Sequence, residues 1–204
     1  MPNDLFVEFS ATSMDSEGRA LSKEQLEFFA GSKCVDESGR LLVVYHASNA
    51  DFDEFSPSKI GTGGGTIYGR GFYFNDSDFG LDIYGTYIKE YYLNLQKPFV
   101  WQMVNRAADA KRNINAFVQV LNANGYPITR ELRKTLEDEI INQDGELDTV
   151  LELTCGEQEA QAYFKNAGFD GIMNLSTGDM VAFSPSQIKR CLDRTPTKRE
   201  LATV

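Results

Sequence analysis

Strand-length apolar runs lie on both sides of a long helical middle, and this order constrains the fold more than any other feature of the sequence. The segments 41–45, LLVVY, and 71–74, GFYF, are rich in β-branched and aromatic residues, as is typical of strands. The segments 169–175 and 179–185 are predicted to form a hairpin, because the turn-forming sequence STG separates them. Strands, then helices, then strands again predict an α+β fold in which strands from both ends of the chain pack together.

Apolar residues recur at helical spacing through the middle of the chain, residues 103–153. The sequence NGYP ends the first helix of this middle. Near the start of the chain, Ser22 followed by Gln25 forms the pattern of a capping box before a helix. We therefore expect helices at 23–31, near 76–86, and at 104–124, 129–141, 147–153 and 156–167, with further strands at 87–95 and 187–192.

The length of 204 residues and the hydrophobic content of 42% fit one domain with a full core. We expect this domain to span 21–193, with an arm at 1–20, a helical insert at 103–153 and a tail at 194–204. The three cysteines show no Cys-x-x-Cys spacing and there is a single histidine, so we expect reduced thiols and no metal site.

The acidic balance limits the partners of the chain. A net charge of −10 disfavours general binding to phosphate backbones, which depends on clustered Lys and Arg, although a local basic groove is compatible with it. The N-terminus lacks a basic segment followed by an apolar run, and no stretch approaches the ~18 apolar residues of a membrane span. We therefore expect a cytoplasmic protein with no membrane contact, and a protein delivered by a phage or a secretion device would have the same features.

The only histidine, His46, follows the apolar run and precedes two small residues, Ala47 and Ser48. A single histidine is often a structural hydrogen-bonding residue, and that interpretation stays open at this point. Small residues beside it would let a ligand approach the backbone, whose N–H and C=O groups can bind an amide or a ribose hydroxyl. His46 is therefore the first candidate site residue.

A glycine-rich loop, GTGGGTIYGRG at 61–71, lies between His46 and the next strand. It lacks the Gly-Lys-Ser/Thr ending of a P-loop, and its glycines do not open a helix directly after a strand, so neither phosphate-binding fingerprint matches. Long loops in compact domains are usually functional or disordered. We interpret these glycines as a flexible lid that ends at Gly71.

Two tyrosines eleven residues apart, Tyr73 and Tyr84, delimit the stretch that follows. Strand alternation places Tyr73 opposite Phe72 and Phe74, so Tyr73 faces a cleft if the phenylalanines are core and is itself core if they are not. A strand–turn–helix return would bring Tyr84, on the helix expected at 76–86, beside it. Two facing aromatic rings form a slot for a flat heteroaromatic ring, and a cationic ring gains further from their π faces.

A candidate carboxylate, Asp179, begins an apolar strand directly after a Gly turn. Asp179 can point into the same cleft while the residues that follow it pack in the core. An ordinary turn or cap aspartate is the alternative interpretation.

The motifs VVYHAS, YGRGFYFND and DMVAFSPSQIK, with Tyr84 eleven residues after Tyr73, resemble the His–Tyr–Glu class of NAD-dependent ADP-ribosyltransferases. This class is the diphtheria-toxin and poly(ADP-ribose)-polymerase branch. The nearest likeness is to the versions in phage and prophage polyvalent proteins and related bacterial toxins. The resemblance covers about 21–92 and about 168–190 and leaves the helical middle unmatched. It implies a split β-sheet core with a helical insert, NAD as co-substrate and no metal.

The resemblance implies a role for each candidate residue. His46 would hydrogen-bond the adenosine-side ribose and fix the nicotinamide-binding strand, and the backbone of Ala47, where the family usually has Gly, would hold the nicotinamide carboxamide. Tyr73 and Tyr84 would sandwich the nicotinamide ring. Asp179 stands where the family has Glu and would stabilise the positive charge that develops on the ribose as the glycosidic bond breaks.

One departure from the family pattern concerns the carboxylate. Asp179 is shorter than Glu by one methylene, and a misplacement of about 1 Å can cost about 10²-fold where positioning carries the catalysis. Gln187 is therefore kept as an alternative catalytic residue, although its spacing better matches a structural position of the family. Ser48 and Gly71 complete the expected set of NAD-binding residues.

The implied activity is mono-ADP-ribosyl transfer to a macromolecule by a bacterial or phage toxin or effector, with an antitoxin or immunity protein as a possible partner. Thr177 occupies the position at which arginine-modifying relatives carry a second Glu, and this argues against an arginine acceptor. The acidic composition favours a protein acceptor over a nucleic acid. The alternatives are an NAD glycohydrolase that uses water as acceptor, a catalytically weak module that binds NAD or ADP-ribose, and an unrelated α+β interaction protein.

Overall fold

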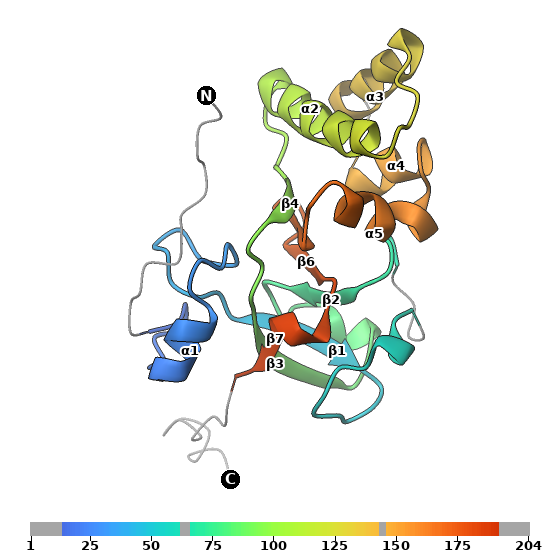
Figure 1. The fold of residues 1–204 in the computed structure, drawn as a ribbon. Coiled ribbons are helices and arrows are strands. Elements are labelled where there is room, and N and C mark those ends of the chain that lie inside the picture. The colour runs from blue at the N-terminus through green and yellow to red at the C-terminus, as the bar shows by residue number, and fades with distance from the viewer. Residues whose placement is uncertain (1–13, 62–65, 143–145, 192–204) are drawn as a thin grey trace.

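The computed structural model describes residues 14–61, 66–142 and 146–191, and within them the chain forms a seven-stranded sheet with helices at its sides (Figure 1). The strand order is β4-β5-β6-β2-β1-β3-β7. Strands from the two ends of the chain are interleaved in this order, because β5, β6 and β7 come from the last part of the chain. The predicted α+β class is confirmed.

The strands are short and mostly antiparallel. Their bounds are β1 (Val44–Ser48), β2 (Phe72–Asn75), β3 (Tyr87–Leu93), β4 (Pro98–Trp101), β5 (Gly171–Asn174), β6 (Asp179–Ala182) and β7 (Ile188–Arg190). The pair β4–β5 is parallel, and every other pair is antiparallel. The predicted hairpin is the β5–β6 pair, whereas β4 has no counterpart among the strands expected from the sequence.

The sheet is nearly divided between β1 and β2. Every residue of β1 has a partner on β3, and every residue of β2 has one on β6, but β1 and β2 share only the pair Tyr45–Asn75. The sheet therefore consists of one half, β4-β5-β6-β2, and a second half, β1-β3-β7, that meet at one point. This near-division agrees with the split sheet that the resemblance implied, and it leaves backbone groups of the two facing strands available for other partners.

The helices gather at two ends of the sheet (Figure 1). Their bounds are α1 (Lys23–Phe28), α2 (Ala107–Ala123), α3 (Arg130–Asn142), α4 (Leu147–Glu152) and α5 (Glu157–Asn166). Ser22 and Gln25 form the predicted capping box at the start of α1. Among the described residues, no helix is both long enough and apolar enough to cross a membrane.

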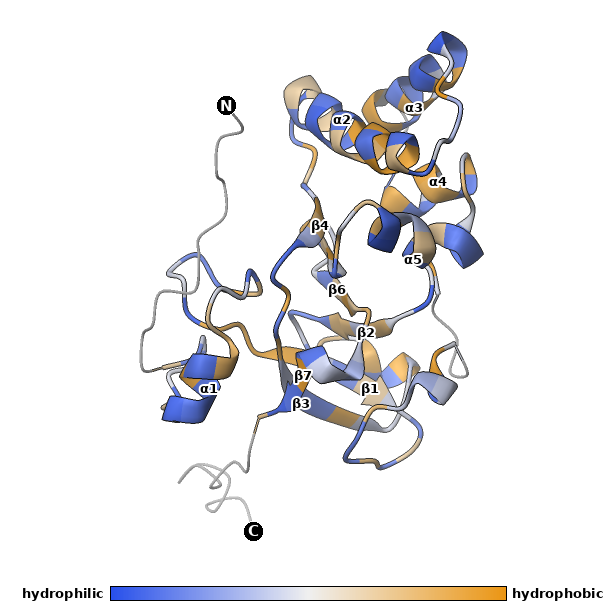
Figure 2. Ribbon diagram, in the orientation of Figure 1, coloured by the Kyte–Doolittle hydropathy of each residue, from blue (hydrophilic) through white to orange (hydrophobic). Residues whose placement is uncertain are grey.

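Two main hydrophobic clusters cover the two faces of the sheet. Helices α2 to α5 share one hydrophobic cluster with residues of β4, β5 and β6, and Figure 2 shows these helices together at one side of the strands. Trp101, Phe117 and Phe164 are fully buried in this cluster. The opposite cluster contains Phe72, Phe74 and residues of β3, β5 and β6. A smaller cluster lies beneath α1.

Two predictions about local structure are wrong. The helix expected near 76–86 is reduced to one 3₁₀ turn, η2 (Leu81–Ile83), because Gly80 before it has a left-handed φ of 76° that interrupts any longer helix. The strand expected at 41–45 begins only at Val44, because Leu41 instead bridges Val35 and accepts a backbone hydrogen bond from Ser16. His46 therefore lies inside β1 and not at its end.

Candidate active site

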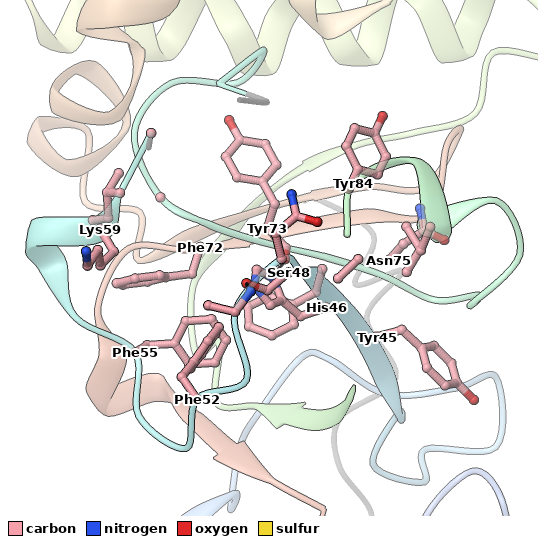
Figure 3. Close-up of a pocket in the computed structure, with 18 of the residues that line it drawn as sticks. Tyr45, His46, Ser48, Phe52, Phe55, Lys59, Phe72, Tyr73, Asn75 and Tyr84 are labelled. Atoms are coloured by element: carbon pink, nitrogen blue, oxygen red, sulfur yellow. Dashed lines mark hydrogen bonds between the residues drawn. The ribbon is translucent and has the colours of Figure 1, made fainter. Parts of the chain in front are cut away.

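A cavity of about 660 Å³ opens where the two halves of the sheet diverge (Figure 3). Its walls come from β1, from β2, from the loop 49–61 that follows β1, and from the η2 turn. The first residue of β6 completes it. Positions far apart in the sequence meet here, and the lining includes His46, Ala47, Ser48, Gly71, Tyr73, Tyr84 and Asp179.

The imidazole of His46 occupies the gap between β1 and β2. Its Nδ1 lies 2.7 Å from the carbonyl oxygen of Tyr73. Since a carbonyl oxygen only accepts, Nδ1 carries the proton and donates, which leaves Nε2 of the neutral ring as an acceptor. Burial lowers the pKa of His46 below its usual value and so favours the neutral ring, although the bond to Tyr73 acts in the opposite direction.

Aromatic rings fix the orientation of His46. The ring centroids of Phe55 and Phe52 lie 5.0 and 5.8 Å from that of His46 in edge-on arrangements. Phe55 also packs against Phe72 and Phe74, so the loop 49–61 is attached to the core beneath β2. His46 is thus both a structural hydrogen-bonding residue and a cavity-lining residue whose Nε2 can accept a hydrogen bond.

Tyr73 projects from β2 on the face opposite to Phe72 and Phe74, which are both buried. The phenylalanines belong to the core cluster and also line the cavity, and Tyr73 lines the cavity from the other face of β2. Its hydroxyl donates to the carbonyl oxygen of Gly69 at 2.6 Å and accepts from the backbone N–H of Tyr68 at 3.0 Å. Burial raises the pKa of Tyr73, so the hydroxyl stays protonated, and its ring is held in place.

Tyr84 lies at the mouth of the cavity, directly after η2, with 56% of its surface exposed. The neighbouring Gly85 is buried against the end of β1, where a Cβ atom would come within 2.2 Å of the Ser48 backbone. Only glycine allows this approach, and it places Tyr84 beside β1. Figure 3 shows the rings of Tyr73 and Tyr84 projecting in the same direction, with open space between them in this view.

Asp179 is held by three donors. Its Oδ1 accepts from the Asn75 amide at 2.9 Å, and its Oδ2 accepts from the Thr177 hydroxyl at 2.8 Å and from the Tyr68 hydroxyl at 3.3 Å. Asn75 is also the β2 partner of Asp179 in the register of β2 and β6. The carboxylate is therefore oriented before any ligand binds, on the wall of the cavity that faces away from β1.

Tyr68, like Asn75, Phe52 and Phe55, belongs to this site and was not among the residues predicted from the sequence. It is 2% exposed, and its hydroxyl accepts from the Asn174 amide at 2.9 Å while it donates to Asp179. Its ring stacks on that of Tyr73 with centroids 6.3 Å apart and planes 18° apart. Tyr68 thus connects the aromatic wall of the cavity to its carboxylate. Its position in the glycine-rich segment gave no signal of this, and residues 62–65 of the expected lid lie outside the described residues.

Gln187 lies apart from the cavity lining and has a structural set of contacts. Its side-chain oxygen accepts from the backbone N–H groups of Phe183 and Ser184 at 3.0 and 2.8 Å. Its amide donates to the carbonyl oxygen of Asp170 at 2.8 Å. These bonds close a capping box before β7, so the geometry favours Asp179 over Gln187 as the candidate catalytic residue.

Residues 36–198 match a family model described as the ADP-ribosyltransferase in polyvalent proteins. The match includes all seven strands and every cavity residue named above, and it runs through the helical middle that the resemblance left unmatched. No curated protein and no solved structure matches the chain. Within the described residues, no group of three His, Cys, Asp or Glu side chains could hold a metal ion.

Proposed function

The chain belongs to the ADP-ribosyltransferases of polyvalent proteins, and from that premise we propose that it is a mono-ADP-ribosyltransferase that cleaves NAD and transfers ADP-ribose to a protein. The family uses NAD as co-substrate. The observation that carries the proposal is the convergence of His46, Tyr73 and Asp179 in one cavity at the division of the sheet. These residues come from β1, β2 and β6, and each has contacts that fix its orientation.

The cavity has the chemistry that the nicotinamide half of NAD requires. The ring of Tyr73 is held by its hydroxyl bonds, and Tyr84 also lines the cavity, so a flat cationic ring bound between them would gain from both π faces. Backbone groups of Ala47 would hold the carboxamide, in a strand end lined by the small residues Ser48 and Gly71. The free Nε2 of His46 would accept a hydrogen bond from a ribose hydroxyl.

Asp179 would act on the reacting sugar. As the bond between C1′ and the nicotinamide nitrogen breaks, its electron pair leaves with nicotinamide and positive charge develops on the ribose. A carboxylate near the 2′-hydroxyl stabilises this charge more than it stabilises the neutral ribose of the ground state. The acceptor then attacks C1′ and releases a proton. The Asp179 side chain is shorter than the Glu of the family, and three hydrogen-bond donors fix its position. A carboxylate whose effect depends on its distance from the ribose needs such a fixed position.

Incubation with NAD labelled in its adenylate half and with a cell lysate tests the proposal. Label attached to macromolecules that survives nuclease and is lost with protease is the expected result. Free labelled ADP-ribose with none attached would instead identify an NAD glycohydrolase. Intact NAD together with measurable NAD binding would identify a binding module, and both results would refute the proposed transfer.

We further propose that the activity serves a toxin or phage effector in a bacterial or phage-infected cell, because the matching family is defined in polyvalent proteins. Expression in a bacterium should arrest growth, and Asp179→Ala should restore growth at the same protein level. Growth that is unaffected by the wild-type chain would contradict the toxin role while leaving the transferase activity to the NAD assay. An antitoxin or immunity protein would be recognised as a gene product that suppresses the arrest.

A further inference from the structure

A run of apolar side chains is exposed at the mouth of the cavity. Phe79 is 93% exposed and Ile83 is 77% exposed, and Tyr87 and Ile88 are also exposed. These residues lie within the segment 76–88, called here the rim. The rim carries Leu81 and Tyr84, which line the cavity. Several large apolar residues exposed together beside a cavity mark an interaction site more often than single ones do.

The rim is anchored at both ends. At its start, the backbone N–H of Asp76 donates to the carbonyl oxygen of Gly178 at 3.1 Å. At its other end, Gly85 packs on the backbone of Ser48, and β3 follows from Tyr87. Between these points the N–H of Phe79 donates to the Ser77 hydroxyl at 3.2 Å. The exposed Phe79 and Ile83 are therefore presented by a fixed turn, which lowers the entropy that a partner must overcome on binding.

The charge of the rim has one sign. It contains Asp76, Asp78 and Asp82 and no Lys or Arg. None of these three carboxylates forms an ion pair with another residue in the part of the chain that the structure describes. Unpaired acidic groups around exposed apolar side chains attract a partner that offers Lys or Arg next to apolar residues. They repel phosphate backbones, and they repel the rim of a second copy of this chain.

We propose that the rim is the docking surface for a basic, apolar segment of the protein that accepts ADP-ribose. Phe79 and Ile83 would insert among aliphatic or aromatic side chains of the acceptor, and the aspartates would face its Lys and Arg. Docking here would place the acceptor beside the opening where Tyr84 stands, and hence near C1′ of NAD. The role of the partner as acceptor rests on the proposed function, whereas the chemistry of the surface does not.

The test separates binding from turnover. The probe is a fluorescent peptide in which Lys alternates with Leu and Phe. The control peptide has Asp in place of each Lys. Fluorescence anisotropy of the peptide measures its binding to the full chain in the absence of NAD. We expect the Lys peptide to bind and the Asp peptide not to bind. The double variant Phe79→Ser/Ile83→Ser should raise the Kd for the Lys peptide by about 10- to 100-fold. The second variant, Asp78→Asn/Asp82→Asn, should weaken this binding less and reduce its dependence on salt. The control Met103→Ser/Leu153→Ser removes apolar residues exposed elsewhere and should change nothing.

Turnover supplies the second readout. Release of nicotinamide from NAD in the absence of acceptor should be unchanged in both rim variants, because Phe79, Ile83, Asp78 and Asp82 do not line the cavity. Transfer of ADP-ribose to protein should fall in parallel with peptide binding. The proposal is overturned if the Lys peptide binds all variants equally or none of them. It is also overturned if the rim variants instead lose binding to an oligonucleotide or lose a dimer of the chain. Absence of NAD cleavage with rim-dependent peptide binding would refute the proposed function and leave the surface intact.

Discussion

Replacing Tyr68 with Phe removes the hydroxyl that links Asp179 to Asn174. The lost hydroxyl is the donor to Asp179 at 3.3 Å and the acceptor for Asn174 at 2.9 Å. Burial raises the pKa of Tyr68 to about 12, so the wild-type hydroxyl is protonated and can donate throughout the neutral range. The aromatic ring remains, and with it the stack on Tyr73.

The magnitude follows from these two bonds. Asn174 is 1% exposed, so its amide hydrogen loses a partner in the core, at a cost of about 1–3 kcal/mol in the free energy of unfolding. The bond to Asp179 is long, so we assign it about 1 kcal/mol, the amount of an ordinary hydrogen bond and less than the ~1.5–3 kcal/mol typical of bonds to charged groups. If that amount is lost only in the transition state, kcat for nicotinamide release falls about 5-fold. KM for NAD should stay the same, because Tyr68 does not line the cavity.

Steady-state release of nicotinamide, with thermal unfolding of the same samples, provides the assay. Tyr126→Phe is the matched control, because the Tyr126 hydroxyl donates at the same 3.3 Å distance to a carbonyl oxygen, that of Thr154, among the helices. We expect the control to lose some stability and keep kcat. A Tyr68→Phe enzyme with lowered stability and full kcat, or with a raised KM and full kcat, would refute a positioning role for this hydroxyl.

Three further changes have defined outcomes. Gln187→Ala should lower the free energy of unfolding by about 1–3 kcal/mol, because the N–H groups of Phe183 and Ser184 lose their acceptor. The folded variant should keep its kcat. Loss of kcat without loss of stability would restore Gln187 as the catalytic candidate. Gly85→Ala should raise KM for NAD, measured by nicotinamide release. A Cβ atom at this position would lie 2.2 Å from the backbone of β1 and would displace the turn that carries Tyr84. An unchanged KM would contradict a role of Tyr84 in NAD binding. His46 is the only histidine, and burial lowers its pKa in the folded protein below the value of ~6.5 in the unfolded chain. The unfolded chain therefore takes up a proton at a higher pH than the folded protein does. The contribution of His46 to the free energy of unfolding is complete above pH ~6.5 and is lost as the pH falls below that value. Denaturant titrations at pH 5–8 should show this loss in the wild type and not in His46→Gln, and identical pH dependence of the two would contradict the assignment.

Local patterns in the sequence predicted the elements whose periodicity is uniform. The alternation of Phe72, Tyr73 and Phe74 predicted two opposed faces, and the structure has buried phenylalanines on one and Tyr73 on the other. Helices α2 to α5 were expected close to their observed bounds, because each has a continuous apolar face. The turn after β2 was not predicted correctly. The sequence around it is compatible with a longer helix, but the left-handed conformation of Gly80 prevents one.

Contacts between distant segments were beyond what such patterns contain. Tyr68 and Asp179 are 111 positions apart, and only the pairing of β2 with β6 brings them together. Strands β1 and β2 share only the register pair Tyr45–Asn75, so the sheet is nearly divided between them. No residue spacing in the sequence indicates this division. The motifs of the family did bring His46, Tyr73 and Asp179 into one hypothesis, since they contain information on spatial proximity that periodicity lacks.

We propose that the cavity at the divided sheet breaks the bond between nicotinamide and ribose, with Asp179 as the residue that stabilises the charge on the ribose. The most direct test is the rate of nicotinamide release from NAD by the wild type and by Asp179→Ala, with the Kd for NAD measured on both proteins. We expect the rate to fall at least about 10²-fold with a nearly unchanged Kd, because the carboxylate acts on charge that exists only in the transition state. Release at the wild-type rate by Asp179→Ala would contradict it.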